Sequence, residues 1–378
     1  NHLDPHAPAG TPALVDVIDP ATDEVTGSIP VGPQPHHIYP VPGLNEAFIS
    51  HFTGCSLDVV DLVHNTVIGQ VQTRFGPRHL TFGPVGDFAY AIDYYSSSLT
   101  VIDTANNHTV AEIPTGPNPN YPQLSNDGAT VFVVNSGSDT MTVAQAKAPF
   151  AVLRTITVGQ HPFDLALTPD GTTLVVANAG DDTVSFVDTA TLTVRGSASL
   201  HPTGTPVAST KSQKRNVRIS SDGRYAWVGD QLGAAFSVFD IPTGELATVI
   251  PASGGADIFT ELTIGPSRGL AITTARYGPT LDVVTPSPPA PRGQITTAPS
   301  CATSACATSY PGDTGPRGVG SHQLVTDPTG TRAYISDRPG GAVTVLDLSS
   351  GQPRLLTNIP TSYGAYGFPD GITYVWFT

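Results

Sequence analysis

Basic side chains are scarce in this chain of 378 residues, in which 17 Lys and Arg stand against 31 Asp and Glu for a net charge of −14. Charged residues of both signs make up only 13% of the sequence. Proteins that bind nucleic acid through its phosphates carry a basic patch or stripe, and this sequence contains none. We therefore expect no nucleic-acid partner.

Long apolar segments are also missing. The longest apolar runs have the length of a β-strand, whereas a membrane-spanning helix needs about 20 apolar residues, so we expect no membrane span. Methionine occurs once and lysine is rare, whereas Thr, Gly, Pro and Ala are frequent, a composition that suggests a protein exported by a bacterium with a GC-rich genome. The sequence begins at Asn1 without a basic and apolar leader, which is consistent with a mature exported protein or with a trimmed chain.

Short catalytic and cofactor motifs give little help. The sequence has no P-loop and no dinucleotide-binding fingerprint, and its isolated glycines stand in turns between strand-like segments. No Ser/His/Asp set stands out, so nucleophilic catalysis finds little support. No HxH or HExxH spacing is present, so a metal site would have to be assembled from residues far apart in the chain.

The chain does contain one unit repeated eight times. A turn such as LTPDGT or ISSDGR leads into an apolar strand such as LVVAN or AWVGD, and then into a strand that ends in Asp, such as VSFVD. The turn positions are Pro42, Pro84, Asn126, Pro169, Ser221, Pro266, Pro328 and Pro369. Nine residues after each turn position stand His51, Asp93, Asn135, Asn178, Asp230, Ala275, Asp337 and Thr378. Four short strands in a unit of about 40 to 45 residues are typical of a β-propeller blade.

The two ends of the chain share the eighth unit. The segment GFPDGITYVWFT supplies its first two strands, and PALVDVIDPATDEVTGSIPVG supplies its last two, with Asp19 in the recurrent Asp position. Such a junction closes a ring and leaves no exposed sheet edge. We therefore expect an all-β fold, an eight-bladed β-propeller of four-stranded antiparallel blades. A seven-bladed ring is the alternative, in which the sixth unit, ELTIGPSRGLAITTARYGPTLDVV, would be something else.

Residues 1–378 are expected to form a single β-propeller domain, because no single blade can bury its own sheet faces. Two insertions, at about 201–214 and 286–320, interrupt the repeat. Both fall in the connection from an outer strand to the next inner strand, and these connections lie at one mouth of the ring. The insertions are therefore candidate lids over that mouth, and the alternative is that they are decorative loops.

Three cysteines are present. Cys301 and Cys306 stand close together in SCATSACAT, where a local disulfide in an oxidising compartment is the expected arrangement. Cys55 remains, four residues after His51, either as a small inert core residue or as a soft metal ligand.

The pattern VGxxPxxLxxxPDGxxxxVxN followed by VxVxD resembles the YVTN-type propeller repeats of bacterial and archaeal extracytoplasmic proteins. The clearest copy is VGQHPFDLALTPDGTTLVVANAGDDTVSFVD, residues 158–188, and the similarity extends over essentially the whole chain. The resemblance implies the propeller fold. Propellers of this kind include lactonase-like enzymes, non-catalytic subunits of some amine dehydrogenases, surface proteins and the copper-site propeller of nitrous oxide reductase, so the resemblance selects no single function.

The register of the repeat predicts which residues line the central axis, because each innermost strand begins five or six residues before a turn position. The ends of the second strands, nine residues after the turn positions, should lie near the same face. Four contiguous units, the last two and the first two, supply His322, Gln323, Tyr363, His36, His37, His51, His79 and Asp93. The opposite arc supplies Asp164, Arg215, Asn216, Asp230 and Glu261. A histidine-rich half should therefore face an acidic half across the channel.

This distribution predicts a transition-metal site, because imidazoles from several blades can converge on copper, zinc or iron. The expected ligands are His37, His79, His322 and His51. The expected catalytic residues are Asp93, Asp164, Glu261 and Tyr363, with the carboxylates either completing the metal shell or acting as a base. In the alternative interpretation, these histidines only solvate a water-filled channel.

Two functions are compatible with these observations. The first is a secreted metal-dependent enzyme that acts on a small molecule at the mouth of the channel, by hydrolysis of a lactone or ester, by lyase chemistry, or by copper- or iron-based oxidation. The second is a non-catalytic scaffold that binds a ligand, or a protein partner on one propeller face, at the cell surface or within a larger complex.

Overall fold

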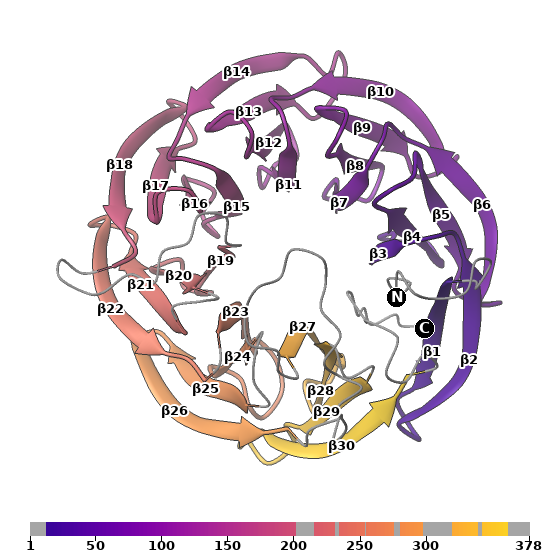
Figure 1. Cartoon of the computed structure of the whole chain (residues 1–378), viewed down its shortest axis with the longest axis vertical. Coiled ribbons are helices and arrows are strands. Elements are labelled where there is room, and N and C mark those ends of the chain that lie inside the picture. Colours follow the sequence, from indigo (N-terminus) through magenta and orange to yellow (C-terminus); the bar gives the residue numbers. More distant parts are fainter. Residues whose placement is uncertain are drawn as a thin grey trace.

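The computed structural model describes residues 13–201, 215–230, 234–253, 255–275, 280–297, 320–338 and 342–361. The regular structure in these ranges is β-strand, and its sheets are arranged in a ring around a central axis (Figure 1). Seven sheets have four antiparallel strands in chain order, and one sheet has two. We number the four-stranded sheets as blades 1 to 7 and call the two-stranded sheet the closing sheet.

The strand bounds follow a regular rhythm. The closing sheet is β1 (Ala13–Asp19) and β2 (Glu24–Val31). Blade 1 is β3 (Pro35–Pro40), β4 (Glu46–His51), β5 (Ser56–Asp61) and β6 (Thr66–Gln72). Blade 2 is β7 (Pro77–Phe82), β8 (Phe88–Asp93), β9 (Ser98–Asp103) and β10 (His108–Pro114). Blade 3 is β11 (Pro119–Leu124), β12 (Thr130–Asn135), β13 (Thr140–Gln145) and β14 (Val152–Thr157).

The other four blades repeat this order. Blade 4 is β15 (Pro162–Leu167), β16 (Thr173–Asn178), β17 (Thr183–Asp188) and β18 (Thr193–Ser199). Blade 5 is β19 (Val217–Ile219), β20 (Tyr225–Asp230), β21 (Ala235–Asp240) and β22 (Glu245–Pro251). Blade 6 is β23 (Ala256–Glu261), β24 (Ala271–Ala275), β25 (Thr280–Pro286) and β26 (Pro289–Thr296). Blade 7 is β27 (Gly320–Thr326), β28 (Arg332–Arg338), β29 (Ala342–Asp347) and β30 (Arg354–Pro360).

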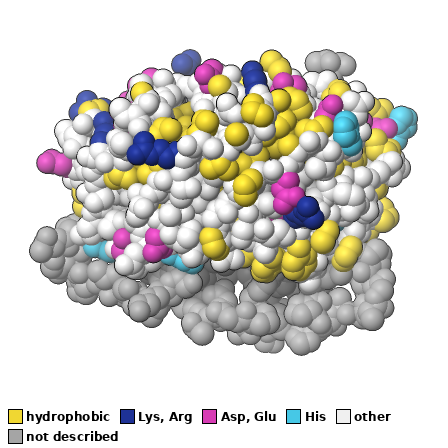
Figure 2. All heavy atoms as spheres, turned by 90° about the horizontal axis from the view of Figure 1, so that it is seen from above, with side chains coloured by type: hydrophobic (Ala, Val, Ile, Leu, Met, Phe, Trp, Pro, Cys, Tyr) yellow, Lys and Arg dark blue, Asp and Glu magenta, His cyan; other side chains and the backbone are white. Residues whose placement is uncertain are grey.

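The core lies between neighbouring blades. The second and third strands of each blade are almost continuously apolar and buried, because both faces of these strands are covered by adjacent sheets. The outer strands are largely exposed, and seven of the eight, counting β2, contribute one buried apolar side chain near their end. These residues are Ile29, Val71, Ile113, Ile156, Ile250, Ile295 and Ile359. Seen edge-on, the wall of the ring accordingly shows apolar side chains scattered among polar ones, with few charges (Figure 2).

The turns between first and second strands pack on one another. Gly86 has φ +73°, and a Cβ atom there would lie 2.6 Å from the carbonyl oxygen of Pro42, the turn residue of the preceding blade. Gly128 has φ +64°, and its Cβ would lie 2.5 Å from the ring of Pro84 in the same way. Both a left-handed backbone and a close approach thus require glycine, which explains the recurrence of Gly in this turn.

The closing sheet packs against a blade on each side. Ile29, with partly buried Val15 and Val17, joins a cluster with Ala47 and Ile49 of blade 1. On the other side, partly buried apolar residues of the closing sheet join Tyr334, Val343, Val345 and Ile359 of blade 7. The two-stranded sheet therefore links the first blade to the last with apolar contacts.

The expectation of eight four-stranded blades is wrong. The described part of the chain contains seven such blades, and the remaining sheet has two strands whose apolar residues, mostly partly buried, pack against blades 1 and 7. The first two strands of the expected eighth unit, residues 367–378, lie outside the described residues, whereas its last two are β1 and β2. Of the expected insertions, residues 202–214 and 298–319 also lie outside them, whereas Pro289–Thr296 forms β26. Within the described ranges no helix is long and apolar enough to cross a bilayer.

We expect the substitution Ile29→Ala to lower the free energy of unfolding by about 2–4 kcal/mol, because it removes burial and leaves a cavity between the closing sheet and blade 1. Ile29 is 2% exposed, whereas Ile68 on β6 is 54% exposed. The control Ile68→Ala should therefore change that free energy by less than about 0.5 kcal/mol. Denaturant titration followed by circular dichroism measures both values. Equal losses in the two variants would contradict a core role for the closing sheet.

Candidate metal site

The innermost strands of blades 1 and 2 begin with a β-bulge that places consecutive side chains on the same side. In blade 1, Pro35 pairs with His51 and Ile38 pairs with Ile49, so His36 and His37 together oppose one residue, Ser50. The backbone N–H of His37 donates to Ser50 Oγ at 3.2 Å. Such a bulge breaks the strict alternation of side chains along a strand and redirects them.

The same irregularity occurs at the same place in blade 2. Pro77 pairs with Asp93 and Leu80 pairs with Ala91, which leaves Arg78 and His79 in the bulge. The Ser50 hydroxyl donates to the backbone carbonyl of Arg78 at 2.9 Å and so ties the two bulges together. The bulge residues of neighbouring blades are thereby held side by side.

Three histidines meet as a result. One ring nitrogen from each of His36, His37 and His79 lies within 4.8 Å of the corresponding nitrogens of the other two. The ring centres are 4.2 Å apart for His36 and His37, 4.9 Å for His37 and His79, and 5.4 Å for His36 and His79. We call this group the histidine trio. Within the part of the chain that the structure describes, no carboxylate or cysteine joins it.

The surroundings of the trio hold two of its rings in place. His79 stacks on Tyr121 with ring centres 3.8 Å apart and an interplanar angle of 20°. His79 Nδ1 lies 3.4 Å from the Tyr39 hydroxyl, and His37 Nδ1 lies 3.4 Å from the side-chain amide nitrogen of Gln323. Burial and the neighbouring Tyr121 raise the pKa of Tyr39, so its hydroxyl stays protonated.

These contacts fit a metal ion. Metal-binding histidines commonly use one ring nitrogen as the ligand and direct the other to a polar neighbour, which fixes the ring orientation. His79 Nδ1 faces the Tyr39 hydroxyl, which can accept its proton, so Nε2 is the candidate ligand atom of that ring. The Gln323 amide nitrogen is a donor, so Nε2 of His37 can bind a metal only when that amide is turned and its oxygen accepts from Nδ1–H. Separations of up to 4.8 Å leave room for an ion about 2.0–2.1 Å from each nitrogen after small ring rotations.

The structure thus brings together two of the four histidines predicted as ligands, His37 and His79. It adds His36, which the sequence had placed on the axis but not among the ligands. Two consecutive histidines at the start of an innermost strand were the available signal, because a bulge lets both point the same way. The side chain of His322 and the whole of Tyr363 lie outside what the structure describes.

His51, the third predicted ligand in the described part, has other partners. Its Nδ1 lies 3.0 Å from the Pro33 carbonyl oxygen, and its Nε2 lies 3.0 Å from Asp58 Oδ2. Asp58 also accepts hydrogen bonds from the Gly32 N–H at 2.7 Å and the Gln70 amide at 2.8 Å. Burial alone would raise the pKa of Asp58, but these donors outweigh it and hold the pKa below its usual range. Both nitrogens of His51 therefore face acceptors, and it stands apart from the trio.

This pairing belongs to a pattern shared by several blades. Residues at the end of the second strand form hydrogen bonds with side chains five and seven positions further on, in the third strand. Asn135 Nδ2 donates to the hydroxyls of Thr140 and Thr142 at 3.0 and 2.9 Å. Asn178 Nδ2 donates to those of Thr183 and Ser185, both at 3.0 Å. In blade 1 the seventh position is Asp58 rather than a hydroxyl residue, which suits the histidine.

Asp93 occupies the same position in blade 2. It is fully buried, and its Oδ2 accepts hydrogen bonds from Ser98 at 3.1 Å and Thr100 at 2.7 Å. Burial raises the pKa of Asp93 to about 7, although the two hydroxyls oppose the rise. This carboxyl group lies inside the sheet among third-strand hydroxyls.

The acidic residues of the opposite arc are paired. Asp164 accepts from the Arg218 guanidinium at 2.8 Å and from the Val217 N–H at 3.1 Å. Burial raises the pKa of Asp164, and Arg218 opposes that rise. Glu261 accepts from the backbone N–H and the hydroxyl of Ser221 at 2.7 and 2.6 Å. These carboxylates come from blades on the other side of the ring from β3 and β7 (Figure 1).

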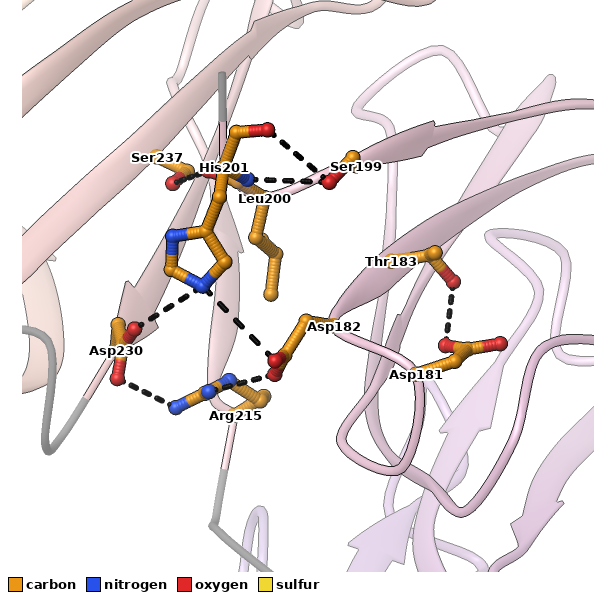
Figure 3. A network of polar contacts seen from close by, with 9 residues as sticks. All are labelled: Asp181, Asp182, Thr183, Ser199, Leu200, His201, Arg215, Asp230 and Ser237. Carbon is orange, nitrogen blue, oxygen red and sulfur yellow. Dashed lines mark hydrogen bonds and ion pairs between the residues drawn. The ribbon is translucent and has the colours of Figure 1, made fainter. Parts of the chain in front are cut away.

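A second charged network joins blades 4 and 5 (Figure 3). Buried Arg215 donates to Asp230 and to Asp182, both at 2.7 Å. His201 Nε2 lies 3.5 Å from Asp230 and 4.0 Å from Asp182. His201 and Arg215 flank residues 202–214, so the two ends of that segment share the same pair of carboxylates. The network holds neighbouring blades together, because removing one partner would leave a buried charge uncompensated.

One serine occurs in a GxSxG pattern, at Gly265–Gly269. A nucleophile elbow needs this pattern between a strand and a helix, with the hydroxyl exposed. Here the segment is the turn between β23 and β24, and buried Ser267 donates its hydroxyl to the Leu348 carbonyl at 3.0 Å. The serine is a structural residue of the turn.

Comparison with known proteins agrees with this architecture. The family model "Lactonase, 7-bladed beta-propeller" matches residues 56–195, from β5 to β18, and its seven blades match the number of four-stranded blades. No curated protein sequence matches the chain. Neither of these two comparisons identifies the repeat as the YVTN type.

Several solved structures share the fold. Hydrazine synthase of Kuenenia stuttgartiensis is 20% identical, with 90% of this chain and 89% of that chain covered and a TM-score of 0.56. Dihydro-heme d1 dehydrogenase NirN in complex with DHE is 16% identical, with 93% and 68% covered and a TM-score of 0.62. A functionally unknown protein from Desulfotomaculum acetoxidans DSM 771 is 13% identical, with 94% of each chain covered and a TM-score of 0.57. At these identities the likeness concerns the fold alone.

We expect Asp93→Asn to stabilise the protein at alkaline pH. Because the folded-state pKa of Asp93 is about 7 and the unfolded one is near 4, the neutral form favours folding. That contribution is complete below about pH 4 and is lost as the pH rises to about 7. Asparagine keeps the side chain neutral, so the free energy of unfolding at pH 8.5 should rise by at most about 4 kcal/mol. At pH 4 the gain should disappear.

Denaturant titrations at the two pH values measure this difference. The control is Asp103→Asn at the end of β9, where hydrogen bonds from Asn106 lower the pKa of the exposed carboxyl group. That control should give no gain at pH 8.5. A gain of the same size at both pH values would contradict the buried ionisation of Asp93.

Proposed function

We propose that this protein is a metal-dependent enzyme that hydrolyses a small lactone or ester at the histidine trio. The observation that carries the proposal is the convergence of His36, His37 and His79 from two neighbouring innermost strands. Three imidazoles with a further position open to water or substrate are typical of catalytic zinc sites, and copper and iron also accept imidazole ligands.

The residues of the trio would hold the ion, and Tyr39, Gln323 and Tyr121 would orient two of the rings. An ion bound there would supply Lewis acidity to an ester carbonyl and lower the pKa of water, the two contributions that ester hydrolysis needs. His36 is half-buried, whereas His37 and His79 are buried. The open side of the site therefore lies beside His36.

The lactonase match over residues 56–195 favours hydrolysis of a cyclic ester over lyase or oxidation chemistry. We also propose that the chain is an exported protein of the YVTN-repeat type. The composition and the repeat in residues 158–188 support this assignment. A disulfide between Cys301 and Cys306 is part of the same proposal, and both cysteines lie outside the described residues. Cys55 is a free, exposed thiol.

We expect the purified protein to bind about one transition-metal ion per chain, and His37→Ala and His79→Ala each to reduce this below about 0.1. Elemental analysis measures the stoichiometry, and an absorption spectrum separates copper and iron from zinc. His108→Ala, which alters an exposed histidine on β10, is the control and should leave the metal content unchanged. Chelation should abolish hydrolysis of a lactone panel, and re-addition of the metal should restore it.

Two results would overturn the proposal. A stoichiometric metal that survives the double substitution of His37 and His79 would place the ion elsewhere. A wild-type chain that takes up no copper, zinc or iron and hydrolyses no lactone would favour the non-catalytic scaffold, on which a ligand or protein partner binds to one propeller face.

A further inference from the structure

The side chain of Arg78 is surrounded by aromatic rings. Its Cζ atom lies 5.4 Å from the centre of the Phe52 ring, 5.5 Å from that of Tyr94 and 6.0 Å from that of Phe163. A guanidinium group over aromatic faces is attracted by their electron density. The rings stabilise the cation without neutralising it.

The charge of Arg78 has no counterion in the described part of the chain. Its guanidinium donates one hydrogen bond, from Nη1 to Asn120 Oδ1 at 2.9 Å, and its buried Nε has no partner there. Arg215 and Arg218, by contrast, form ion pairs with Asp230, Asp182 and Asp164. In a chain with a net charge of −14, a half-buried arginine without a carboxylate partner is well suited to receive an anionic ligand.

Arg78 lies next to the histidine trio. It directly precedes His79 and shares its bulge on β7. The Phe52 ring, which lies under the guanidinium, is also 5.7 Å from the ring of His36. One aromatic ring therefore separates the cation from the open side of the candidate metal site.

The aromatic surface continues outward from Arg78. Tyr95 lies 5.2 Å from Phe52 and 5.1 Å from Tyr94, and Phe75 stacks on Tyr95 at 5.0 Å. Tyr95 is 50% exposed and Phe75 is 44% exposed. A continuous set of rings thus leads from solvent to the cation, and its flat faces favour a planar ligand.

We propose that Arg78, Phe52 and Tyr94 form a substrate subsite for a carboxylate attached to a planar aromatic body. Arg78 would bind the carboxylate, and the rings would stack on the body, which positions the ester at the trio. This assignment of substrate class rests on the proposed function, but binding at the subsite can be measured without the metal. A single guanidinium neutralises one charge, which matches a carboxylate better than a phosphate dianion.

The test uses 1-naphthoate and its neutral analogue 1-naphthamide as probes, with binding measured by calorimetry on chelator-treated full-length protein. Wild type should bind naphthoate at least about tenfold more tightly than naphthamide, because only naphthoate carries the charge that Arg78 recognises. Arg78→Gln should remove this preference and leave naphthamide binding unchanged. Phe52→Leu should weaken both probes alike, by about five- to tenfold.

Two further variants make the result specific. Arg195→Gln is the matched control, because Arg195 also lies over an aromatic ring, Phe186, but on the outer strand β18. It should preserve the preference for naphthoate. Arg78→Lys keeps the charge but loses the planar group, so it should retain a reduced preference, and it serves if Arg78→Gln does not fold.

The outcomes separate the subsite from the metal site. His37→Ala should lose metal and keep the preference for naphthoate, so a failed metal site leaves the subsite standing. The subsite is overturned if naphthoate does not bind, if naphthamide binds equally well, or if a folded Arg78→Gln protein keeps the preference. An unchanged preference in Arg78→Lys, when Arg78→Gln cannot be obtained, would likewise contradict recognition by the guanidinium.

Discussion

Burial of sheet faces between neighbouring blades is the constraint on which the rest of the structure depends. Each blade offers two apolar faces, and neither can be covered except by the next blade or by the closing sheet. The side chains of the second and third strands are therefore used to pack against neighbouring blades. Chemistry is then confined to the strand ends, and among these the start of the innermost strand has an additional freedom, because a bulge lets two consecutive side chains face the same way.

The fold was largely predictable from the sequence, because the same turn and strand pattern recurs in every blade. Strand order, the inner and outer positions, and the antiparallel pairing all follow from that pattern. The blade count was not. From the sequence, the two chain ends together were expected to form a complete four-stranded blade. In the structure, the described strands β1 and β2 form a two-stranded sheet, and its apolar residues contact blade 1 on one side and blade 7 on the other. A repeat indicates how often a pattern occurs, but packing decides what closes the ring.

The candidate site was predictable in part. The register placed His37 and His79 at equivalent positions of adjacent blades, and the structure brings them together with His36. His51 shows what register alone misses. At the end of β4 a histidine stands where blades 2 to 4 have Asp or Asn, and its Nε2 pairs with Asp58, which stands where those blades have Thr or Ser. In blade 6 the equivalent of Asp58 is Asp282 and the equivalent of the histidine is Ala275, so the aspartate also occurs without a histidine partner. Comparing these two repeat positions together, blade by blade, would have predicted that the histidine pairs with the aspartate of its own blade rather than with a metal.

The turn glycines have a consequence for how such a ring can change. Gly86 rests on Pro42, and Gly128 rests on Pro84, so each blade carries one half of its joint with the blade before it. In such a contact the glycine always belongs to the later blade and the proline to the earlier one, so one blade can take the place of another in it. Between blades 6 and 7 the pattern changes, because Gly265 and Gly330 meet backbone to backbone. A blade could be gained or lost at the regular joints while its neighbours keep their own contacts, whereas the close backbone contact between blades 6 and 7 ties those two blades to each other.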